Sequence, residues 1–169
     1  MINNKNLIME LSSIEHLKTL KFKGFVSISH LQKDASIIPK EKGIYMVLDP
    51  NQKNIFLKVG SGGFFKGKNP NVSIDELEKN WVDNAFVLYI GKAGASNSSA
   101  TLYSRLKQYL NFGKGKNVGH WGGRYIWQMA NSDELVICWL PLDRTEPRDA
   151  EKLFIKLFVQ EYTKTSTIV

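Results

Sequence analysis

The chain has 169 residues, a length that suits one compact domain. Apolar residues make up 43% of it, which is enough for a hydrophobic core and excludes an intrinsically disordered protein. The formal net charge is +7, and a basic balance of this size favours a polyanionic partner such as nucleic acid or an acidic membrane surface.

Apolar spacing and turn residues predict the elements of the first half of the chain. Residues 9–20 have the apolar periodicity of a helix, and residues 24–30 are predicted to form a short strand. Residues 43–48 are predicted to form a strand that pairs as a hairpin with a second strand over 55–59, because a turn signal lies between them. A loop over 60–71 precedes a helix over 73–79, with Ser73 as its cap and Glu76 completing a capping box.

The second half alternates strands and helices. Residues 86–91 are apolar enough for a strand buried on both faces, and residues 101–111 form an amphipathic helix. Residues 111–123 are rich in glycine and lysine and are expected to be an exposed loop. Two strands are predicted over 124–129 and 135–140, and a last helix runs from Pro147 to about Tyr162. These elements predict an α/β (α+β) fold with a small mixed β-sheet flanked by helices.

Cysteine usage and hydropathy favour a cytoplasmic protein without a membrane partner. Cys138 is the only cysteine, so no disulfide can form within the chain, which fits a reducing compartment. No apolar run approaches the roughly 20 residues that a spanning helix needs. The segment from Met1 to Ser13 lacks the basic and apolar regions of a signal peptide.

Two tripeptides carry the main functional signal. The first is Gly43-Ile44-Tyr45, and the second is Tyr89-Ile90-Gly91, followed by Lys92. An arginine follows on a predicted helix (Arg105), and a glutamate on a later one (Glu151). This order resembles the GIY-YIG nuclease superfamily over about residues 43–160. The similarity is closest to the nuclease half of a bacterial excision-repair subunit, in which a lysine follows the second tripeptide and Leu-x-x-Tyr follows the helical arginine.

The resemblance implies a division of the chain. Residues 43–169 would form the nuclease domain, and residues 1–42 an N-terminal extension that packs on it. Between Tyr45 and Tyr89 lie 43 residues, far more than in most family members, so an insertion is expected at about 60–84. The family's Pro-x-x-Asn after the last helix has no counterpart in residues 161–164.

The resemblance also implies an active site, to which it assigns Tyr45, Tyr89, Lys92, Arg105, Tyr109, His120 and Glu151. The arginine would hold phosphate oxygens, and the glutamate would bind Mg²⁺ or Mn²⁺, since Mg²⁺ needs few protein carboxylates when phosphate and water complete its shell. The alternative for Glu151, on an apolar helix stripe, is an ion pair with Arg148.

The other residues of this set have structural alternatives as well. Tyr45 and Tyr89 fit half-buried strand tyrosines. A tyrosine with a pKa near 10 is a poor base unless a cation such as Lys92 or a metal helps it. His120 is a candidate general base, whereas a histidine in a glycine-rich loop is often simply solvated.

Lysines and aromatic residues near these motifs predict a nucleic-acid surface. It consists of Lys107, Lys114, Lys116 and Arg124, interleaved with Trp121 and Tyr125. The resulting expectation is a metal-dependent endonuclease that cuts or nicks DNA. The alternatives are a non-catalytic nucleic-acid-binding module on the same scaffold, and a protein-interaction domain whose insertion docks a partner.

Overall fold

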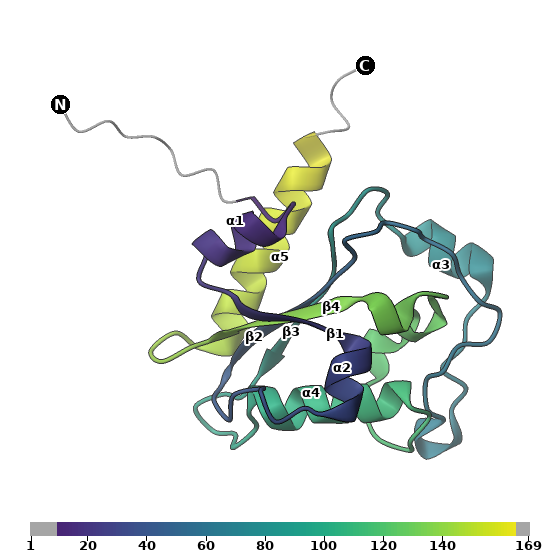
Figure 1. The fold of residues 1–169 in the computed structure, drawn as a ribbon, viewed down its shortest axis with the longest axis horizontal. Coiled ribbons are helices and arrows are strands. Elements are labelled where there is room, and N and C mark those ends of the chain that lie inside the picture. The colour runs from purple at the N-terminus through teal and green to yellow at the C-terminus, as the bar shows by residue number, and fades with distance from the viewer. Residues whose placement is uncertain (1–9, 165–169) are drawn as a thin grey trace.

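The computed structural model describes residues 10–164, which form one four-stranded sheet with helices on both faces (Figure 1). The strands are β1 (Lys23–Ser27), β2 (Gly43–Leu48), β3 (Val87–Ala93) and β4 (Val136–Pro141), in the order β1-β4-β2-β3. The predicted α+β class is confirmed. All three pairings are antiparallel, so the sheet is not the mixed one that was expected.

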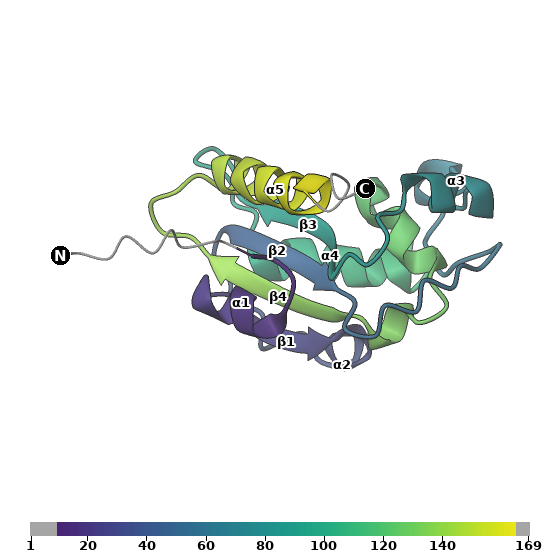
Figure 2. The ribbon, with the colours of Figure 1, turned by 90° about the horizontal axis from the view of Figure 1, so that it is seen from above.

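Two helical layers bury the central strand. Helices α1 (Ile14–Thr19) and α5 (Pro147–Lys164) cover one face of the sheet, and α2 (Ile28–Lys33) and α4 (Leu102–Gly113) cover the other (Figures 1 and 2). Every residue of β2 is buried. Successive side chains of a strand point to opposite faces. Tyr45 and Val47 therefore pack in the α4 layer, while Ile44, Met46 and Leu48 pack in the α5 layer.

The predicted hairpin partner at residues 55–59 is not a strand. Its only ladder contact is a single bridge between Phe56 and Met129, and Ile55 and Val59 are exposed. The reason lies in the sheet, because β2 has β3 on one side and β4 on the other, which leaves no free edge for a hairpin.

The predicted strand at 124–129 is also wrong. Residues Trp121–Gln128 form a 3₁₀ helix, η2, in which Ile126, Trp127 and Gln128 are buried in succession instead of alternating. A second 3₁₀ turn, η3 (Ser132–Glu134), leads into β4. The predicted strand at 24–30 ends early, because the Ser27 hydroxyl accepts a hydrogen bond from the His30 N–H and starts α2.

The segment between β2 and β3 contains η1 (Phe65–Gly67) and α3 (Ile74–Asn80). Ser73 caps α3 as predicted by accepting from the Glu76 N–H, but the Glu76 carboxylate accepts instead from the Tyr125 hydroxyl at 2.6 Å. The buried Gln128 side chain closes this segment. Its Nε2 donates to the carbonyls of Leu57 and Val72, and its Oε1 accepts from the Val72 N–H.

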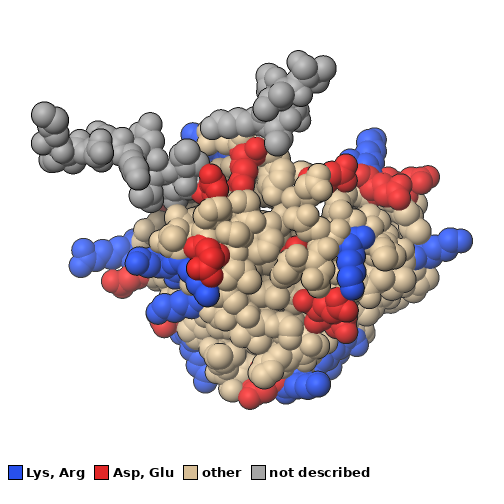
Figure 3. Space-filling view, turned by 45° about the horizontal axis from the view of Figure 1, so that its top comes forward, with Lys and Arg blue, Asp and Glu red and all other residues tan. Residues whose placement is uncertain are grey.

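On the face in Figure 3, basic and acidic side chains are interspersed rather than separated into one basic field. Within residues 10–164, no helix has the length and apolar character needed to cross a membrane.

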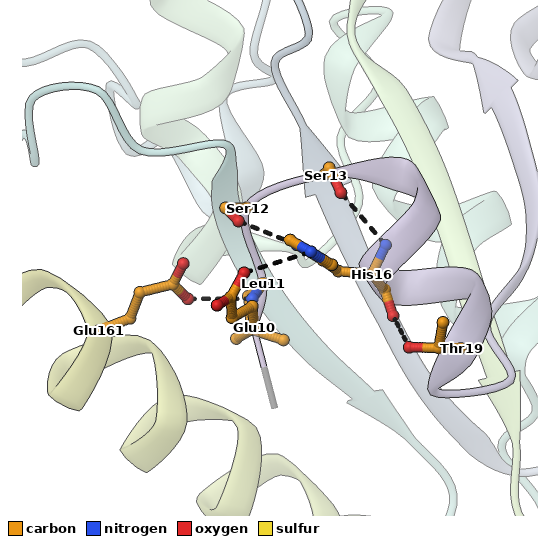
Figure 4. A network of polar contacts seen from close by, with 7 residues as sticks. All are labelled: Glu10, Leu11, Ser12, Ser13, His16, Thr19 and Glu161. Atoms are coloured by element: carbon orange, nitrogen blue, oxygen red, sulfur yellow. Dashed lines mark hydrogen bonds and ion pairs between the residues drawn. The ribbon is translucent and has the colours of Figure 1, made fainter. Parts of the chain in front are cut away.

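The described part of the predicted N-terminal extension is integrated into the fold, since β1 pairs with β4 as an edge strand. Helix α1 starts at the Ser13 cap and is shorter than the predicted 9–20, whose Met9 lies outside the described residues. Just before α1, the Leu11 N–H donates to Glu161 Oε2 of α5 at 2.9 Å (Figure 4). This contact ties the start of the described chain to the last helix.

Candidate functional site

A cavity of about 390 Å³ lies at the edge of the sheet, around one end of β3. Five of the seven predicted catalytic residues line it, namely Tyr45, Tyr89, Lys92, Arg105 and Glu151. Small residues complete its wall, and these are Gly91, Ala93, Gly94, Ala95, Ser98 and Ala100. In the sequence, this wall corresponds to the segment of small and polar residues that follows the second tripeptide, at 94–99.

Strand order explains why side chains from both helical layers meet there. Arg105 projects from the first turns of α4 and Glu151 from the second turn of α5, on opposite faces of the sheet. Because β3 is an edge strand, the two layers can approach each other around it. The loop after β3 turns at Gly94, whose φ is +87°, and the Ser96 N–H donates to Glu146 at 3.2 Å, which ties this wall to the start of α5.

The two tripeptides fit each other across the sheet. Tyr45 of β2 stands opposite Gly91 of β3 in the antiparallel register. A Cβ placed on Gly91 would lie 2.3 Å from Tyr45 Cζ and 2.5 Å from its hydroxyl oxygen, so only glycine leaves room for the phenol. The final glycine of the second tripeptide thus allows the tyrosine of the first to occupy its position.

We expect Gly91→Ala to lower the free energy of unfolding by about 1–3 kcal/mol, because the methyl group overpacks the buried Tyr45 ring. Urea denaturation measures the change. Gly122→Ala is the matched control, since a Cβ there would meet only the Tyr89 hydroxyl at 3.5 Å and is expected to change stability by no more than about 0.5 kcal/mol. Equal stability of the two variants would contradict the proposed fit.

Tyr45 is hydrogen-bonded to a buried histidine. Its hydroxyl lies 2.9 Å from His120 Nε2, and each residue is 1% exposed. His120 is therefore not the solvated loop residue that its glycine-rich context allowed. Burial, reinforced by the nearby Arg105 guanidinium, lowers the pKa of His120 to about 4, so its ring is neutral at pH 7. Burial also raises the pKa of Tyr45 well above its usual range, and the smaller effect of Arg105 does not reverse this.

Tyr109 lies beneath this pair and does not line the cavity. It is fully buried, with its ring 4.6 Å from that of His120 and 4.9 Å from that of Trp127 between centroids. Its plane is within 10° of that of Tyr89, at 6.0 Å. Tyr109 was expected among the catalytic residues; in the structure it packs against Tyr89 and His120, both of which belong to that set.

Glu151 is paired across the cavity with β3. Its Oε2 lies 2.6 Å from Lys92 Nζ, and this contact takes the place of the ion pair with Arg148 that the sequence allowed. The Glu151 side chain is 19% exposed. Within residues 10–164, no three His, Cys, Asp or Glu side chains gather as a metal-binding group. One carboxylate can suffice for Mg²⁺, which keeps most of its waters, although Lys92 competes for the same oxygen.

Arg105 is held by a residue that the sequence did not single out. Its Nη1 donates to Gln108 Oε1 at 2.8 Å, one helical turn further along α4. The arginine is half-buried, so this bond restricts the guanidinium while part of it remains open to the cavity. An i, i+3 pair of this kind is visible in the sequence once the helix is known.

The four predicted nucleic-acid-binding residues do not form one patch. Lys114 Nζ donates to the Gln32 carbonyl of α2. The pKa of Asp34, just after α2, is lowered mainly by hydrogen bonds from Ser36, with Lys107 the smallest contributor. At about 100° per residue, Lys107 lies about 200° around α4 from Arg105, and therefore on the other side of the helix.

Lys116 and Arg124 lie elsewhere. Lys116 is exposed in the loop after α4. Arg124 is on η2, where its guanidinium carbon lies 4.7 Å from the ring centroids of both Trp121 and Tyr125. The predicted interleaving of cation and aromatic rings therefore occurs at Arg124 alone among the four residues.

Comparison of the chain with protein-family models, with curated proteins and with solved structures found no match. The assignment of a function therefore depends on the geometry and chemistry of the side chains around the cavity.

Proposed function

We propose that this chain is a metal-dependent endonuclease that hydrolyses phosphodiester bonds in DNA. The observation that carries this proposal is the convergence of Arg105 and Glu151, which come from opposite faces of the sheet, on one cavity with Tyr45 and Tyr89. Phosphoryl transfer uses such groups for positioning and charge stabilisation, and this open cavity holds a cationic hydrogen-bond donor, a carboxylate and two phenols.

Arg105 would bind the scissile phosphate. Its planar guanidinium can donate to two phosphate oxygens at once, and the bond to Gln108 limits its movement before the substrate arrives. A donor that is already in place when negative charge develops stabilises the transition state without a cost for reorganisation.

Glu151 would hold Mg²⁺ or Mn²⁺, and the bound ion would neutralise charge on the phosphate and the leaving oxygen. Lys92 neutralises the Glu151 carboxylate in the structure described here. When the carboxylate binds a cation, Lys92 becomes free to donate to a substrate oxygen within the same cavity. Glu151 and Lys92 thus have complementary roles in binding an anionic substrate.

Tyr45 and His120 would move the proton of the attacking water. Tyr45 lines the cavity, whereas His120 does not and is hydrogen-bonded to the Tyr45 hydroxyl. In the tautomer whose Nε2 accepts from the Tyr45 hydroxyl, the phenol can take a proton from water as it gives its own to the neutral imidazole. This relay needs no free phenolate, which the raised pKa of Tyr45 disfavours. It does form an imidazolium, which the lowered pKa of His120 also disfavours, so the transfer to the ring is uphill at pH 7.

A plasmid assay tests the proposed function. Purified protein incubated with supercoiled plasmid and Mg²⁺ or Mn²⁺ is expected to yield nicked or linear DNA, and a chelator is expected to stop the reaction. Gel electrophoresis separates the three forms. Plasmid that stays supercoiled with both metals would refute the proposal.

The second candidate is a non-catalytic nucleic-acid-binding module. It is favoured by the Lys92 ion pair on the cavity's carboxylate and by the missing Pro-x-x-Asn. Binding of DNA that weakens steeply with salt, with no metal-dependent product, is the result that this alternative predicts.

A further inference from the structure

A second cavity lies beside the first, and Tyr89 lines both. It has a volume of about 240 Å³ and is bounded by the end of α3, by β3, by η2 and by α5. Four of its lining residues are aromatic, namely Trp81, Tyr89, Tyr125 and Phe158. We refer to it below as the aromatic cavity.

The aromatic cavity continues along the edge strand. A groove of about 220 Å³ between β3 and α5 shares Tyr89 and Phe158 with it and extends to Ile90 and Ile155. The cavity that contains Arg105 and Glu151 and the aromatic cavity are therefore neighbours along β3, on either side of Tyr89.

The Tyr125 ring is held in place from two sides. Its hydroxyl donates to Glu76 Oε1 at 2.6 Å, and the Arg124 guanidinium lies over its face at 4.7 Å from the centroid. Asn80 stands at another wall, with its Nδ2 bonded to the Glu76 carbonyl at 2.8 Å. This set of groups suits the binding of a nucleobase, because it combines flat rings, a nearby cation and an amide whose oxygen can accept a hydrogen bond.

We propose that the aromatic cavity binds the base of an unpaired nucleotide next to the scissile phosphate, so that the preferred substrate is DNA with an unpaired base at the cut. This inference rests on the proposed endonuclease function. A base inside a duplex is stacked on both faces and cannot enter such a cavity, whereas an unpaired base can turn into it and stack on aromatic rings.

Charge places the DNA backbone on one side of this cavity. Helix α3 carries the exposed acidic residues Asp75, Glu76 and Glu78, which repel phosphate. Arg124 lies on the η2 side, and Arg105 lines the adjoining cavity. The phosphates therefore run past the two arginines, and the base points from there toward Trp81.

Tyr125 is the residue to change, because Trp81 also supports the fold by bonding Asn54 and packing on Phe56. Tyr125→Ala removes the ring. Tyr125→Phe keeps the ring and removes only the bond to Glu76, which makes it the matched control. Circular dichroism and thermal unfolding of both variants establish that they are folded before binding is compared.

The first experiment measures binding without metal, so that it does not depend on cleavage. A duplex with one unpaired 2-aminopurine is titrated with protein, and stacking of this base on aromatic rings changes its fluorescence. We expect a change with wild type and Tyr125→Phe, and affinity weakened about tenfold or more in Tyr125→Ala. Equal affinity and equal fluorescence for all three proteins would overturn the aromatic cavity as a base site.

The second experiment measures cleavage with Mg²⁺ on the same duplex and on its fully paired counterpart. Wild type is expected to cut the duplex with the unpaired base at least about tenfold faster, and Tyr125→Ala is expected to lose this preference while still cutting. Equal cutting of both duplexes by wild type overturns this inference and leaves the endonuclease intact. A fluorescence change without any cutting overturns the endonuclease and leaves a base-binding site.

Discussion

Replacing Arg105 by alanine is expected to lower the rate of DNA cleavage by about 10²–10³-fold, and Glu151→Ala is expected to do the same. Arg105 is the guanidinium that faces the cavity, and Glu151 is the carboxylate that lines it. Losing either removes charge stabilisation that acts on the phosphate in the transition state. Rates of plasmid nicking under single-turnover conditions measure the effect.

Both variants should remain folded, which separates loss of activity from loss of structure. The Lys92–Glu151 pair is partly exposed, with 41% and 19% of the side chains accessible, and pairs of this kind contribute little to stability. Lys107→Ala on the far side of α4 and Asp149→Ala on α5 are the matched controls, because neither residue lines the cavity. Cutting at the wild-type rate by Arg105→Ala or Glu151→Ala would refute the assigned roles.

The second large effect concerns stability in acid. The pKa of His120 is lowered to about 4 in the folded protein, against about 6.5 in an unfolded chain. Between these values the unfolded state binds more protons, so stability rises with pH. The contribution of His120 is complete above pH 6.5 and is lost as pH falls toward 4. At about 1.4 kcal/mol per pH unit, the loss amounts to about 3 kcal/mol.

Chemical denaturation at several pH values between 4 and 7 measures this loss, and His120→Gln isolates it. Glutamine does not titrate, so the variant's stability should depend less steeply on pH in this window, whatever its absolute stability. Carboxylates elsewhere titrate alike in both proteins and cancel in the comparison. Parallel curves for wild type and His120→Gln would show that the histidine is not held neutral by burial.

Local sequence patterns were sufficient for the elements that build the cavity. The bounds of β2 were predicted as observed. Helix α4 begins at Leu102, directly after Thr101, where the predicted helix began and which is its N-cap. Periodicity and caps are local signals, and in these segments the tertiary environment agrees with them. The predicted strands at 55–59 and 124–129 failed because pairing depends on which sheet edges are free, and the neighbours of β2 occupy both of its edges.

The predicted basic patch also depended on contacts between segments that the sequence alone does not fix. Lys107, Lys114, Lys116 and Arg124 are close in sequence or share a basic, aromatic stretch, but proximity along a chain does not fix direction in space. Helical rotation places Lys107 on the side of α4 away from Arg105, Lys114 bonds to α2, and Arg124 stacks on Tyr125 of the aromatic cavity. Charge counts alone therefore indicated a polyanionic partner without locating its contact surface.

The sequence by itself determined the residue types of the candidate site and the elements that carry them, because tripeptides, caps and apolar spacing are properties of neighbouring residues. Only the tertiary structure decided that Arg105 and Glu151 share a cavity, since this depends on β3 being an edge strand between two helical layers. The bond between Tyr45 and His120 spans 75 residues of chain. Contacts across such separations arise from packing, and no local pattern encodes them.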